Sequence, residues 1–411
     1  MFSAQVSPIA IDFGSSAIKF LQISTDQRPS LVAATEIAVP DSARGDAEKL
    51  FAFYTEQVAK VVKSGRFKGK RAVSAVPSGQ TLIQHMQVPQ AENKNDLVKG
   101  QLQATFGLTP DSVVVRAVDV CDTFRGGQAR REMICFAVSH EMVMKYIDVM
   151  RKARLEVVGM HTETVAMVHA FDHLNRRESD AQVATLYCDL GYSGMRVAVS
   201  HGKDIAFARY VPIGGKHIDQ HIASSLHCDV PTARNHRMSM NHEVEAMTGV
   251  LTKGKPGAGA ALLNVAMQAG GKSAKGQMSI GTAVAEDRRV GMTPAELAQE
   301  LEPSALPALV QKANLGEILD TLTDEILMCL RYHHTLFNGR AINRVIFVGG
   351  ETRQAWLCQH IVKVLRLSAQ LGDPLARLTV QESMETPGLV LGRPQPGWAV
   401  ACGLCASPTD F

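Results

Sequence analysis

One pattern occurs twice in this chain, at an offset of 177 residues. Each copy consists of two short apolar strands joined by a turn of small residues, and the copies cover residues 9–23 and 186–199. An aspartate precedes each turn, and a cation follows it at the same spacing. The matching pairs are Asp12 with Asp189, Gly14 with Gly191, Ser16 with Ser193, and Lys19 with Arg196. Such a repeat predicts two equivalent halves, each beginning with a β-hairpin.

Further elements are predicted around the two copies. Each hairpin is followed by a third strand, at Leu31–Pro40 and at Ile205–Gly215, so each half starts as a meander. Between the copies we expect strands near residues 72–76, 81–88, 112–121 and 132–138, and helices near residues 93–106, 141–153 and 163–175. Thr162 is a suitable N-cap for the last of these helices. The glycine-rich segment 252–281 predicts a mobile loop.

Length and composition are typical of a multidomain globular protein. The 411 residues exceed what one domain usually contains. Lys and Arg number 43 against 40 Asp and Glu, so no charge excess points to nucleic acid. No apolar run is long enough to cross a bilayer, and the first basic residue is Lys19, which argues against a secretory signal peptide. We therefore expect a cytoplasmic protein.

The two hairpin turns carry the residue types that bind a polyphosphate and its metal ion. An aspartate beside a tight turn can hold a water-shelled Mg²⁺, while exposed turn amides face phosphate oxygens. Two copies can enclose a triphosphate from both sides, with Lys19 as a point charge. Hydroxyl donors come from Ser15, Ser16 and Ser193. The alternative is that the glycines only permit the turns and that the aspartates accept hydrogen bonds from turn amides.

Two glycine pairs follow apolar strands in the second half of the chain. Gly349 and Gly350 end a predicted buried strand, where a nucleobase or ribose can approach the backbone without meeting a side chain. Gly214 and Gly215 end the second meander and can line the same cleft. Each pair also has a plainer interpretation, because the first fits a common strand-to-helix turn and the second fits a bend of the chain.

Together these motifs resemble those of the actin-like ATPase superfamily, and within it those of the PilM-type type IV pilus assembly proteins, relatives of the division protein FtsA. The superfamily motifs lie at residues 12–19, 189–194 and 348–352. The narrower resemblance rests on residues 76–78, 86–89, 152–158 and 211–218. It covers nearly the whole chain.

The resemblance implies an α/β fold of the actin-like, ribonuclease H-like duplicated type, with two lobes and an inserted FtsA/PilM-type subdomain. The implied first lobe core comprises residues 1–78, 159–182 and 394–411, and the second lobe core comprises residues 183–215 and 318–393. The inserted, partner-binding subdomain would span residues 79–158. The outer subdomain of the second lobe would span residues 216–317 and include the loop 252–281.

The same resemblance implies a cytoplasmic ATP- and Mg²⁺-binding scaffold at the cytoplasmic face of the inner membrane, with slow or no ATP hydrolysis. Its implied partners are the cytoplasmic tail of a PilN-like membrane protein, other inner-membrane pilus assembly proteins and further copies of the chain. Asp12 and Asp189 would organise Mg²⁺ through water, and Glu163 and Asp189 would act in catalysis. The residues expected to hold the nucleotide are Asp12, Gly14, Ser15, Ser16, Lys19, Gly191, Tyr192, Ser193, Gly214, Gly215, Lys216, Arg237, Gly349, Gly350 and Glu351.

Several residues depart from the family pattern. Arg234 and Arg237 stand where relatives often have Glu and Lys in contact with adenosine, and Gly194 stands where many have threonine. Glu163 matches the glutamate that positions water in filament-forming relatives, or it interacts only with its helix dipole. Two alternatives to the ATP-binding scaffold remain. One is a nucleotide-free scaffold of the same fold, and the other is a small-molecule kinase of the superfamily, for which we find no sugar-binding motif.

Overall fold

The structure is a computed structural model of the chain. It describes residues 5–90, 94–125, 127–249, 313–380, 384–390 and 392–409. No helix within these ranges is long and apolar enough to cross a membrane. The segment 252–281, predicted to be a mobile loop, lies outside the described residues.

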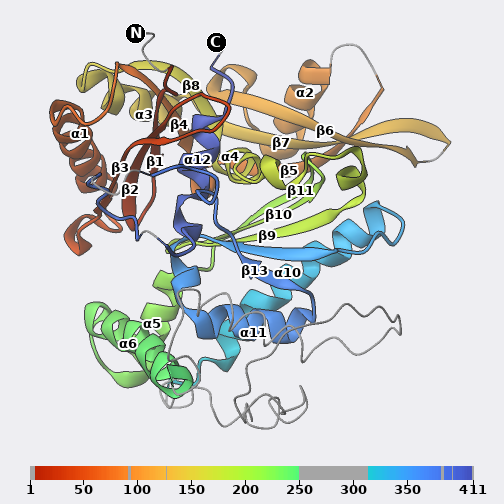
Figure 1. The fold of residues 1–411 in the computed structure, drawn as a ribbon. Helices are drawn as coiled ribbons and strands as arrows, with labels where there is room; N and C mark the ends of the chain where they lie inside the picture. The colour runs from red at the N-terminus through yellow and green to blue at the C-terminus, as the bar shows by residue number, and fades with distance from the viewer. Residues whose placement is uncertain are drawn as a thin grey trace, which may run out of the picture.

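Two five-stranded sheets form the centre of the molecule and repeat one strand order (Figure 1). In each sheet, an antiparallel meander of three strands is extended by two parallel strands. The first sheet has the order β3 (Leu31–Ala38), β2 (Ala17–Ile23), β1 (Ile9–Phe13), β4 (Arg71–Val76), β8 (Glu156–Thr162). The second has the order β11 (Asp204–Val211), β10 (Met195–His201), β9 (Ala184–Leu190), β12 (Arg344–Val348), β13 (Ala369–Leu371). The duplication predicted from the hairpins is confirmed.

The two hairpins also match in register. Asp12 lies opposite Lys19 across the first hairpin, and Asp189 lies opposite Arg196 across the second. Directly opposed residues on antiparallel strands hold their Cβ atoms about 4.5–5.5 Å apart. Each hairpin therefore places one cation beside its own aspartate.

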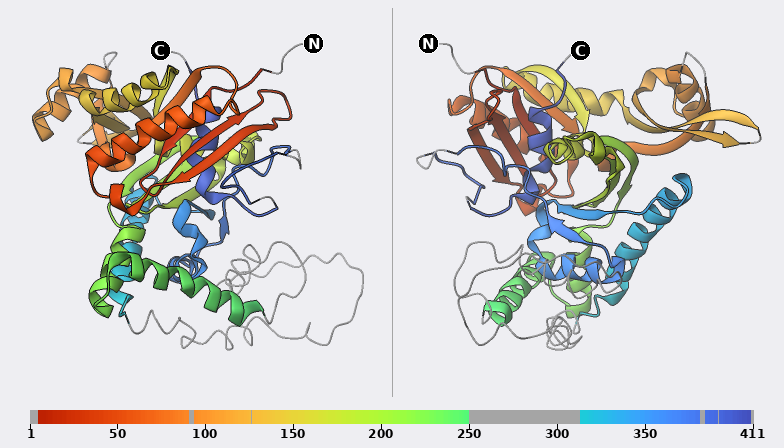
Figure 2. Two further views of the ribbon diagram at one scale, coloured as in Figure 1. Left: turned by 90° about the vertical axis from the view of Figure 1, so that its left-hand side faces the viewer. Right: turned by 45° about the vertical axis from the view of Figure 1, so that its right-hand side comes forward.

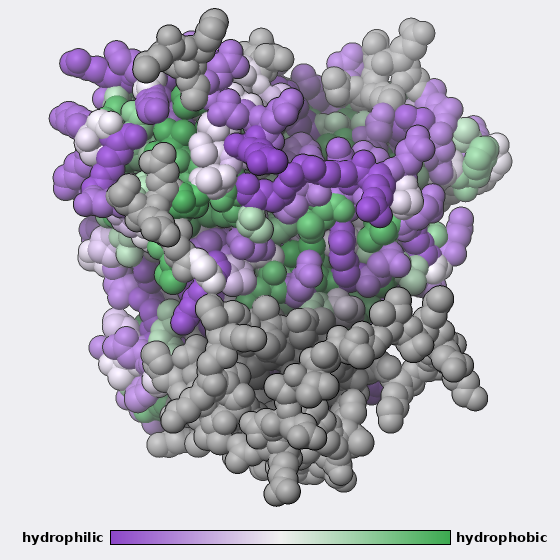
Figure 3. Space-filling model, viewed as in Figure 1, coloured by the Kyte–Doolittle hydropathy of each residue, from purple (hydrophilic) through white to green (hydrophobic). Residues whose placement is uncertain are grey.

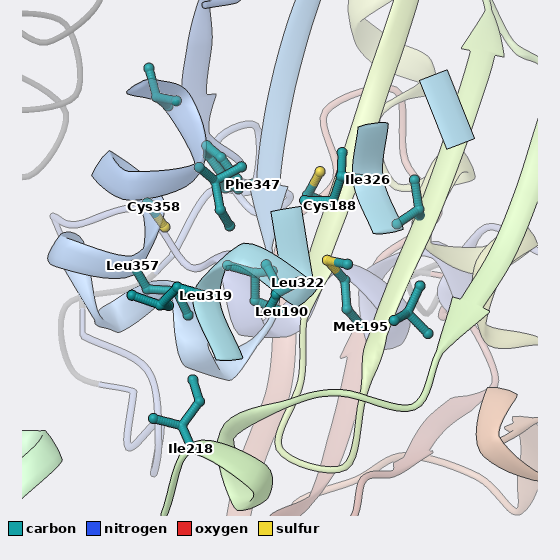
Figure 4. Packing of buried hydrophobic residues seen from close by; sticks show 14 of the residues in the cluster. Cys188, Leu190, Met195, Ile218, Leu319, Leu322, Ile326, Phe347, Leu357 and Cys358 are labelled. Carbon is teal, nitrogen blue, oxygen red and sulfur yellow. The ribbon is translucent and has the colours of Figure 1, made fainter. Parts of the chain in front are cut away.

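Helices cover the outer face of each sheet and also fill the space between the sheets (Figures 1 and 2). The outer face of the first sheet packs against α1 (Ala47–Lys63) and α3 (His140–Lys152). The outer face of the second packs against α5 (Gly215–Leu226), α6 (Val230–Gly249), α10 (Gly316–Leu336) and α11 (Ala355–Leu365). Figure 4 shows Leu319, Leu322 and Ile326 of α10 within this second core.

Two short helices, α4 (Glu163–His169) and α12 (Ala399–Cys405), lie between the sheets. Their closest approach is at Gly403, where an added Cβ would lie only 1.7 Å from the carbonyl oxygen of Ala166. Only glycine allows two backbones to come this close. The C-terminal helix thus joins the first half of the fold, as Figure 1 also shows.

A third sheet, with the strand order β5 (Leu82–Pro89), β7 (Gln128–Ser139), β6 (Val113–Arg125), forms the inserted subdomain with helix α2 (Lys94–Phe106). Its β6–β7 hairpin extends away from the sheets, and Phe124 near the tip is 81% exposed. Figure 3 shows the apolar side chains at this tip. The domain limits given above remain predictions, and the limit at residue 158 falls within β8.

The predicted elements match observed ones in kind, with shifts at their ends. The helix expected near residues 163–175 ends earlier, because α4 stops at His169 and a 3₁₀ turn follows at Asp172–Leu174. Ala170 and Phe171 between them are buried in the core that lies between the sheets. Thr162 is the N-cap of α4, since its hydroxyl accepts a hydrogen bond from the N–H of Val165 at 3.3 Å.

Candidate functional site

A cavity of about 800 Å³ lies between the two halves of the chain, at the turns of the duplicated hairpins. Most of the residues predicted to form the site line this cavity. They are Asp12, Gly14, Ser15, Ser16, Lys19, Glu163, Asp189, Gly191, Tyr192, Ser193, Lys216, Gly349 and Gly350. The fold thus gathers side chains and turns that are far apart in the sequence.

Both hairpin turns depend on glycine at the same position. A Cβ on Gly14 would lie 2.6 Å from the carbonyl oxygen of Ala17, and a Cβ on Gly191 would lie 2.7 Å from that of Gly194. These distances are too short for any side chain. The duplication therefore extends to the shape of the turns.

Neighbouring helices hold the two turns in place. The hydroxyl of Tyr54 on α1 donates a hydrogen bond to the carbonyl oxygen of Gly14 at 3.1 Å. The first two N–H groups of α5 donate to the carbonyl oxygens of Gly191 and Tyr192 at 3.1 and 2.8 Å. The carbonyl side of each turn is therefore occupied by the protein itself.

The amide side of each turn is free. Within the described part of the chain, the N–H groups of Ser15 and Ser16 have no hydrogen-bond acceptor, and neither do those of Tyr192 and Ser193. All four residues line the cavity. Consecutive unpaired N–H groups in a turn form an anion-binding concavity. The cavity thus has two such concavities, one from each half.

Asp12 stands beside the first turn with its side chain buried. Burial raises its pKa to about 6, although Lys19 opposes this shift, and Glu163 adds to it. Because this pKa is raised above the ordinary value of 3.8, the stability linked to Asp12 is full below about pH 4 and is lost as the pH rises through 6. At neutral pH the ionised carboxylate destabilises the unliganded protein.

Arg196 connects the second hairpin to α4. Its Nε and Nη2 atoms lie 2.8 and 2.6 Å from Oδ2 of Asp189, and its Nη1 forms an ion pair with Oε2 of Glu163. The same Glu163 oxygen accepts a hydrogen bond from the N–H of Ser78 at 2.6 Å. Burial alone would lower the pKa of Arg196, but the carboxylates of Asp189, Glu163 and Asp12 raise it. The sequence repeat showed that Arg196 is equivalent to Lys19, but it did not reveal the contact of Arg196 with Glu163.

The other oxygen of Asp189, Oδ1, is buried without a hydrogen-bond partner in the described structure. Gly349, with a φ of +95°, passes so close that an added Cβ would lie 2.3 Å from this oxygen. This positive φ is the second reason for glycine at this position. The double glycine motif therefore fits tightly against the second hairpin.

The donor set around Asp189 shows whether a metal ion fits here. No group of three or more His, Cys, Asp or Glu side chains in the described residues is arranged to hold a metal. Oδ2 of Asp189 and Oε2 of Glu163 already bind the guanidinium of Arg196. In this arrangement the carboxylates of Asp189 and Glu163 fit a guanidinium and do not fit a hydrated Mg²⁺, so these contacts give the predicted Mg²⁺ role of Asp12 and Asp189 no support.

Two cavity residues that sequence reasoning did not include flank Tyr192. The guanidinium carbons of Arg44 and Arg234 lie 4.9 and 5.1 Å from the centre of its ring, within cation–π distance. Arg234 also donates to the Tyr192 hydroxyl at 2.6 Å and pairs with Asp41 of the first half. Arg234 was noted only as a departure from the family pattern, and nothing local marks Arg44 or Asp41.

Four predicted site residues lie behind the cavity wall. Arg237 is fully buried and bonds to Asp219 at 2.5 Å and to Glu351. A Cβ on Gly215 would lie 2.4 Å from Oε1 of Glu351, and one on Gly214 would lie 2.4 Å from the carbonyl oxygen of the second turn. The structure therefore places Gly214, Gly215, Arg237 and Glu351 in packing contacts that support the site.

The departure at Gly194 has a steric explanation. A Cβ at this position would lie 2.3 Å from the hydroxyl of Tyr210 and 2.7 Å from the carbonyl oxygen of Val211. Tyr210 also lines the cavity. Its phenol fills the space that a threonine side chain at position 194 would need.

A second cavity, of about 870 Å³, lies between the inserted subdomain and the second half. It is lined by β5, β11 and α10, and Met328 and Tyr332 of α10 are 40% and 41% exposed. At its floor, the hydroxyl of Tyr332 donates to Glu132 at 2.8 Å, and His85 contacts the same carboxylate at 3.2 Å. Figure 3 shows apolar side chains along this part of the surface.

Comparison with known families identifies the chain. Residues 10–253 match the family described as type IV pilus assembly protein PilM, which is more than half of the sequence. The chain belongs to the PilM family. A comparison with curated proteins gave no match.

A solved structure agrees with the PilM assignment at the level of fold, and two others are more distantly similar. A structure titled PilM–PilN type IV pilus biogenesis complex superposes with a TM-score of 0.67 and 16% identity, covering 98% of both chains. The ethanolamine utilization protein EutJ from Carboxydothermus hydrogenoformans has a TM-score of 0.44 and 13% identity, over 98% of this chain and 90% of that one. MreB 5 of Spiroplasma citri bound to AMPPNP has a TM-score of 0.43 and 12% identity, over 90% and 92%. The superposition on the PilM–PilN structure and the repeated strand order of the two sheets confirm the predicted actin-like, two-lobed α/β fold.

Proposed function

We propose that this PilM-family chain is an ATP-binding scaffold of a type IV pilus inner-membrane assembly complex. It acts at the cytoplasmic face of the membrane and reaches it by binding the cytoplasmic tail of a PilN-like membrane protein. The family supports the pilus role, and the structure superposing at a TM-score of 0.67 is titled a PilM–PilN complex. Other assembly proteins and further copies of the chain are additional candidate partners.

The nucleotide part of the proposal depends on one observation. Unpaired N–H groups from both hairpin turns line a single cavity together with Lys19 and Arg196. Backbone N–H groups and cations that converge from two sides suit the oxygens of a polyphosphate. The size of the cavity, about 800 Å³, lies in the range of small-ligand sites.

The contacts of Glu163 favour slow or absent hydrolysis. A general base must be free to accept a proton from the attacking water. In this structure Oε2 of Glu163 already accepts hydrogen bonds from Arg196 and from the N–H of Ser78, so one of its two carboxylate oxygens is committed to the protein. We therefore assign Glu163 and Asp189 to holding the site together through Arg196. We expect bound nucleotide to act by bringing the two lobes together rather than by being hydrolysed.

ATP is expected to bind the full chain saturably, and the Lys19→Met substitution is expected to weaken binding about tenfold or more by removing a charge-assisted contact. Isothermal titration calorimetry measures both. Lys49→Met is the control, because the exposed Lys49 pairs with the N-cap Asp46 and does not line the cavity.

Failure of folded wild-type protein to bind ATP would favour the nucleotide-free scaffold. Production of ADP at about 1 s⁻¹ or faster with a small-molecule acceptor would favour the kinase alternative. Equal weakening by Lys19→Met and by the Lys49 control would contradict the assignment of Lys19 to the site.

For the partner, we propose that the tail docks in the second cavity. β5 and β11 are each the edge strand of their sheet, so an extended peptide can add to such an edge. On β11 the N–H of Ala208 already donates to the ring of His85 at 3.3 Å, so the peptide would pair beside this contact or displace it. Met328 and Tyr332, one helical turn apart on α10, supply exposed apolar surface on the opposite wall. The resemblance to PilM-type proteins implies a groove to which the inserted subdomain contributes, and β5 belongs to that subdomain.

The Met328→Asp substitution is expected to weaken binding of a synthetic peptide with the tail sequence of the PilN-like protein about tenfold, because it places a charge on the apolar wall. Fluorescence anisotropy with the labelled peptide measures the affinity. Val364→Asp is the matched control, since Val364 is also exposed on a helix but lies outside this cavity. Unchanged affinity in Met328→Asp would place the tail elsewhere on the chain.

A further inference from the structure

We propose that Arg196 is the resident cation of the phosphate site and takes the place of a divalent metal between Asp12, Glu163 and Asp189. The chain then binds a nucleoside polyphosphate without Mg²⁺. This inference rests on the nucleotide site proposed above and specifies its chemistry.

The position of Arg196 is the first support. Its guanidinium contacts Asp189 through two nitrogen atoms and Glu163 through a third, so one side chain joins carboxylates from the hairpin and from α4. Asp12 lies close enough to interact electrostatically with it. A divalent ion that these three carboxylates organised would need the same place.

A comparison of the two hairpins is the second support. Lys19 lies opposite Asp12 and Arg196 lies opposite Asp189, yet only the second pair forms a salt bridge within the described structure. A lysine is a compact point charge, whereas a guanidinium is planar and can bridge two carboxylates at once. The two halves therefore differ in the one property that lets a side chain substitute for a metal ion.

The balance of charge is the third support. Among the described residues, five cations line the cavity, namely Lys19, Arg44, Arg196, Lys216 and Arg234. Four carboxylates of the same described ranges line it, namely Asp12, Asp41, Glu163 and Asp189. The protein thus neutralises its own carboxylates without an added ion, and the unpaired turn amides remain for phosphate oxygens.

The Arg196 side chain also remains available to a ligand. A guanidinium has more N–H groups than the contacts to Asp189 and Glu163 use, and Arg196 lines the cavity. The remaining N–H groups can donate to a phosphate oxygen while the carboxylates hold the side chain in place. Because the guanidinium always carries its charge, this contact does not depend on pH in the physiological range.

The test compares ATP binding by the full chain in excess Mg²⁺ and in excess EDTA, using calorimetry. The wild-type Kd is expected to change less than about threefold between the two conditions. Arg196→Ser is expected to weaken binding in EDTA about tenfold or more and to recover part of the loss when Mg²⁺ is added. Arg209→Met is the control, because Arg209 lies on the adjacent strand and pairs with Glu325 outside this cavity.

A second measurement uses metal alone, so that it does not depend on nucleotide. Electron paramagnetic resonance of free Mn²⁺, a probe for Mg²⁺, is expected to show no binding to this site in the wild type and one added site in Arg196→Ser. Arg196→Lys keeps the charge but lacks the planar guanidinium that reaches Asp189 through two nitrogen atoms and Glu163 through a third, and it covers the case in which the serine variant fails to fold.

The outcomes separate this inference from the function on which it rests. Wild-type ATP binding that falls more than about tenfold in EDTA would overturn the role of Arg196 and leave the ATP-binding scaffold intact. Absence of binding in both conditions would overturn both proposals. Mn²⁺ binding by the wild type as tight as by Arg196→Ser would also overturn the role of Arg196.

Discussion

The Gly403→Ala substitution is expected to destabilise the folded chain by about 3 kcal/mol, the upper end of what overpacking a core usually costs. The added Cβ would lie 1.7 Å from the carbonyl oxygen of Ala166 and 2.4 Å from its carbonyl carbon. Both atoms belong to the backbone of α4, so no side-chain rotation can relieve the overlap. The helices must move apart, and both are packed between the two sheets. Urea denaturation followed by circular dichroism measures the loss.

Gly100→Ala is the matched control for this prediction. Gly100 lies in helix α2, and nothing comes within 4 Å of a Cβ built there. Because alanine favours helix over glycine, this change is expected to stabilise the chain by up to about 1 kcal/mol. Similar small effects from both substitutions would show that α12 and α4 are not in close contact.

The parts of the site predicted from the sequence are those made by neighbours along the chain. A hairpin sets its own register, so the spacing between Asp12 and Lys19 predicts that they face each other, and the repeat extends this to Asp189 and Arg196. Glycine in both turns is explained by contacts with residues three positions later. Local chemistry of this kind is visible in the residue types themselves.

Contacts between distant segments could not be predicted in this way. The ion pair of Arg196 with Glu163 depends on where α4 sits between the sheets, which no spacing in the sequence reveals. The stacking of Arg44 and Arg234 on Tyr192 joins three segments, each of which has an unremarkable sequence. Long side chains can reach many partners, and the fold selects among them.

The pair Gly214 and Gly215 shows how a correct fold can leave a residue's role open. The sequence permitted either a place in the nucleotide cleft or a bend of the chain. In the structure both residues are buried, and their missing side chains make room for the second turn and for Glu351. A glycine motif alone cannot distinguish close approach by a ligand from close approach by the protein.

The second large prediction concerns the buried ion cluster of Arg237, Asp219 and Glu351, which lies behind the wall of the first cavity. Arg237→Met is expected to destabilise the chain by about 3–5 kcal/mol, because it leaves the buried carboxylate of Glu351 without its cation and removes one of the two arginines that bind Asp219. Adding Asp219→Asn and Glu351→Gln removes the uncompensated charges and is expected to recover much of the loss. Urea denaturation of the single and triple variants at pH 7.5 measures both effects.

Arg131→Met is the control that shows whether the loss of stability in Arg237→Met comes from the burial of the ion pairs or from ion pairing alone. Arg131 also binds two carboxylates, those of Asp119 and Asp122 at 3.3 and 2.7 Å, but on the exposed β6–β7 hairpin. Its loss is expected to leave the unfolding midpoint nearly unchanged, because water screens an exposed pair. Equal losses from the two arginine substitutions would contradict the argument, and so would a triple variant no more stable than Arg237→Met. Since Asp219 also binds Arg234, which lines the cavity, the same cluster links the stability of the second lobe to the shape of the site.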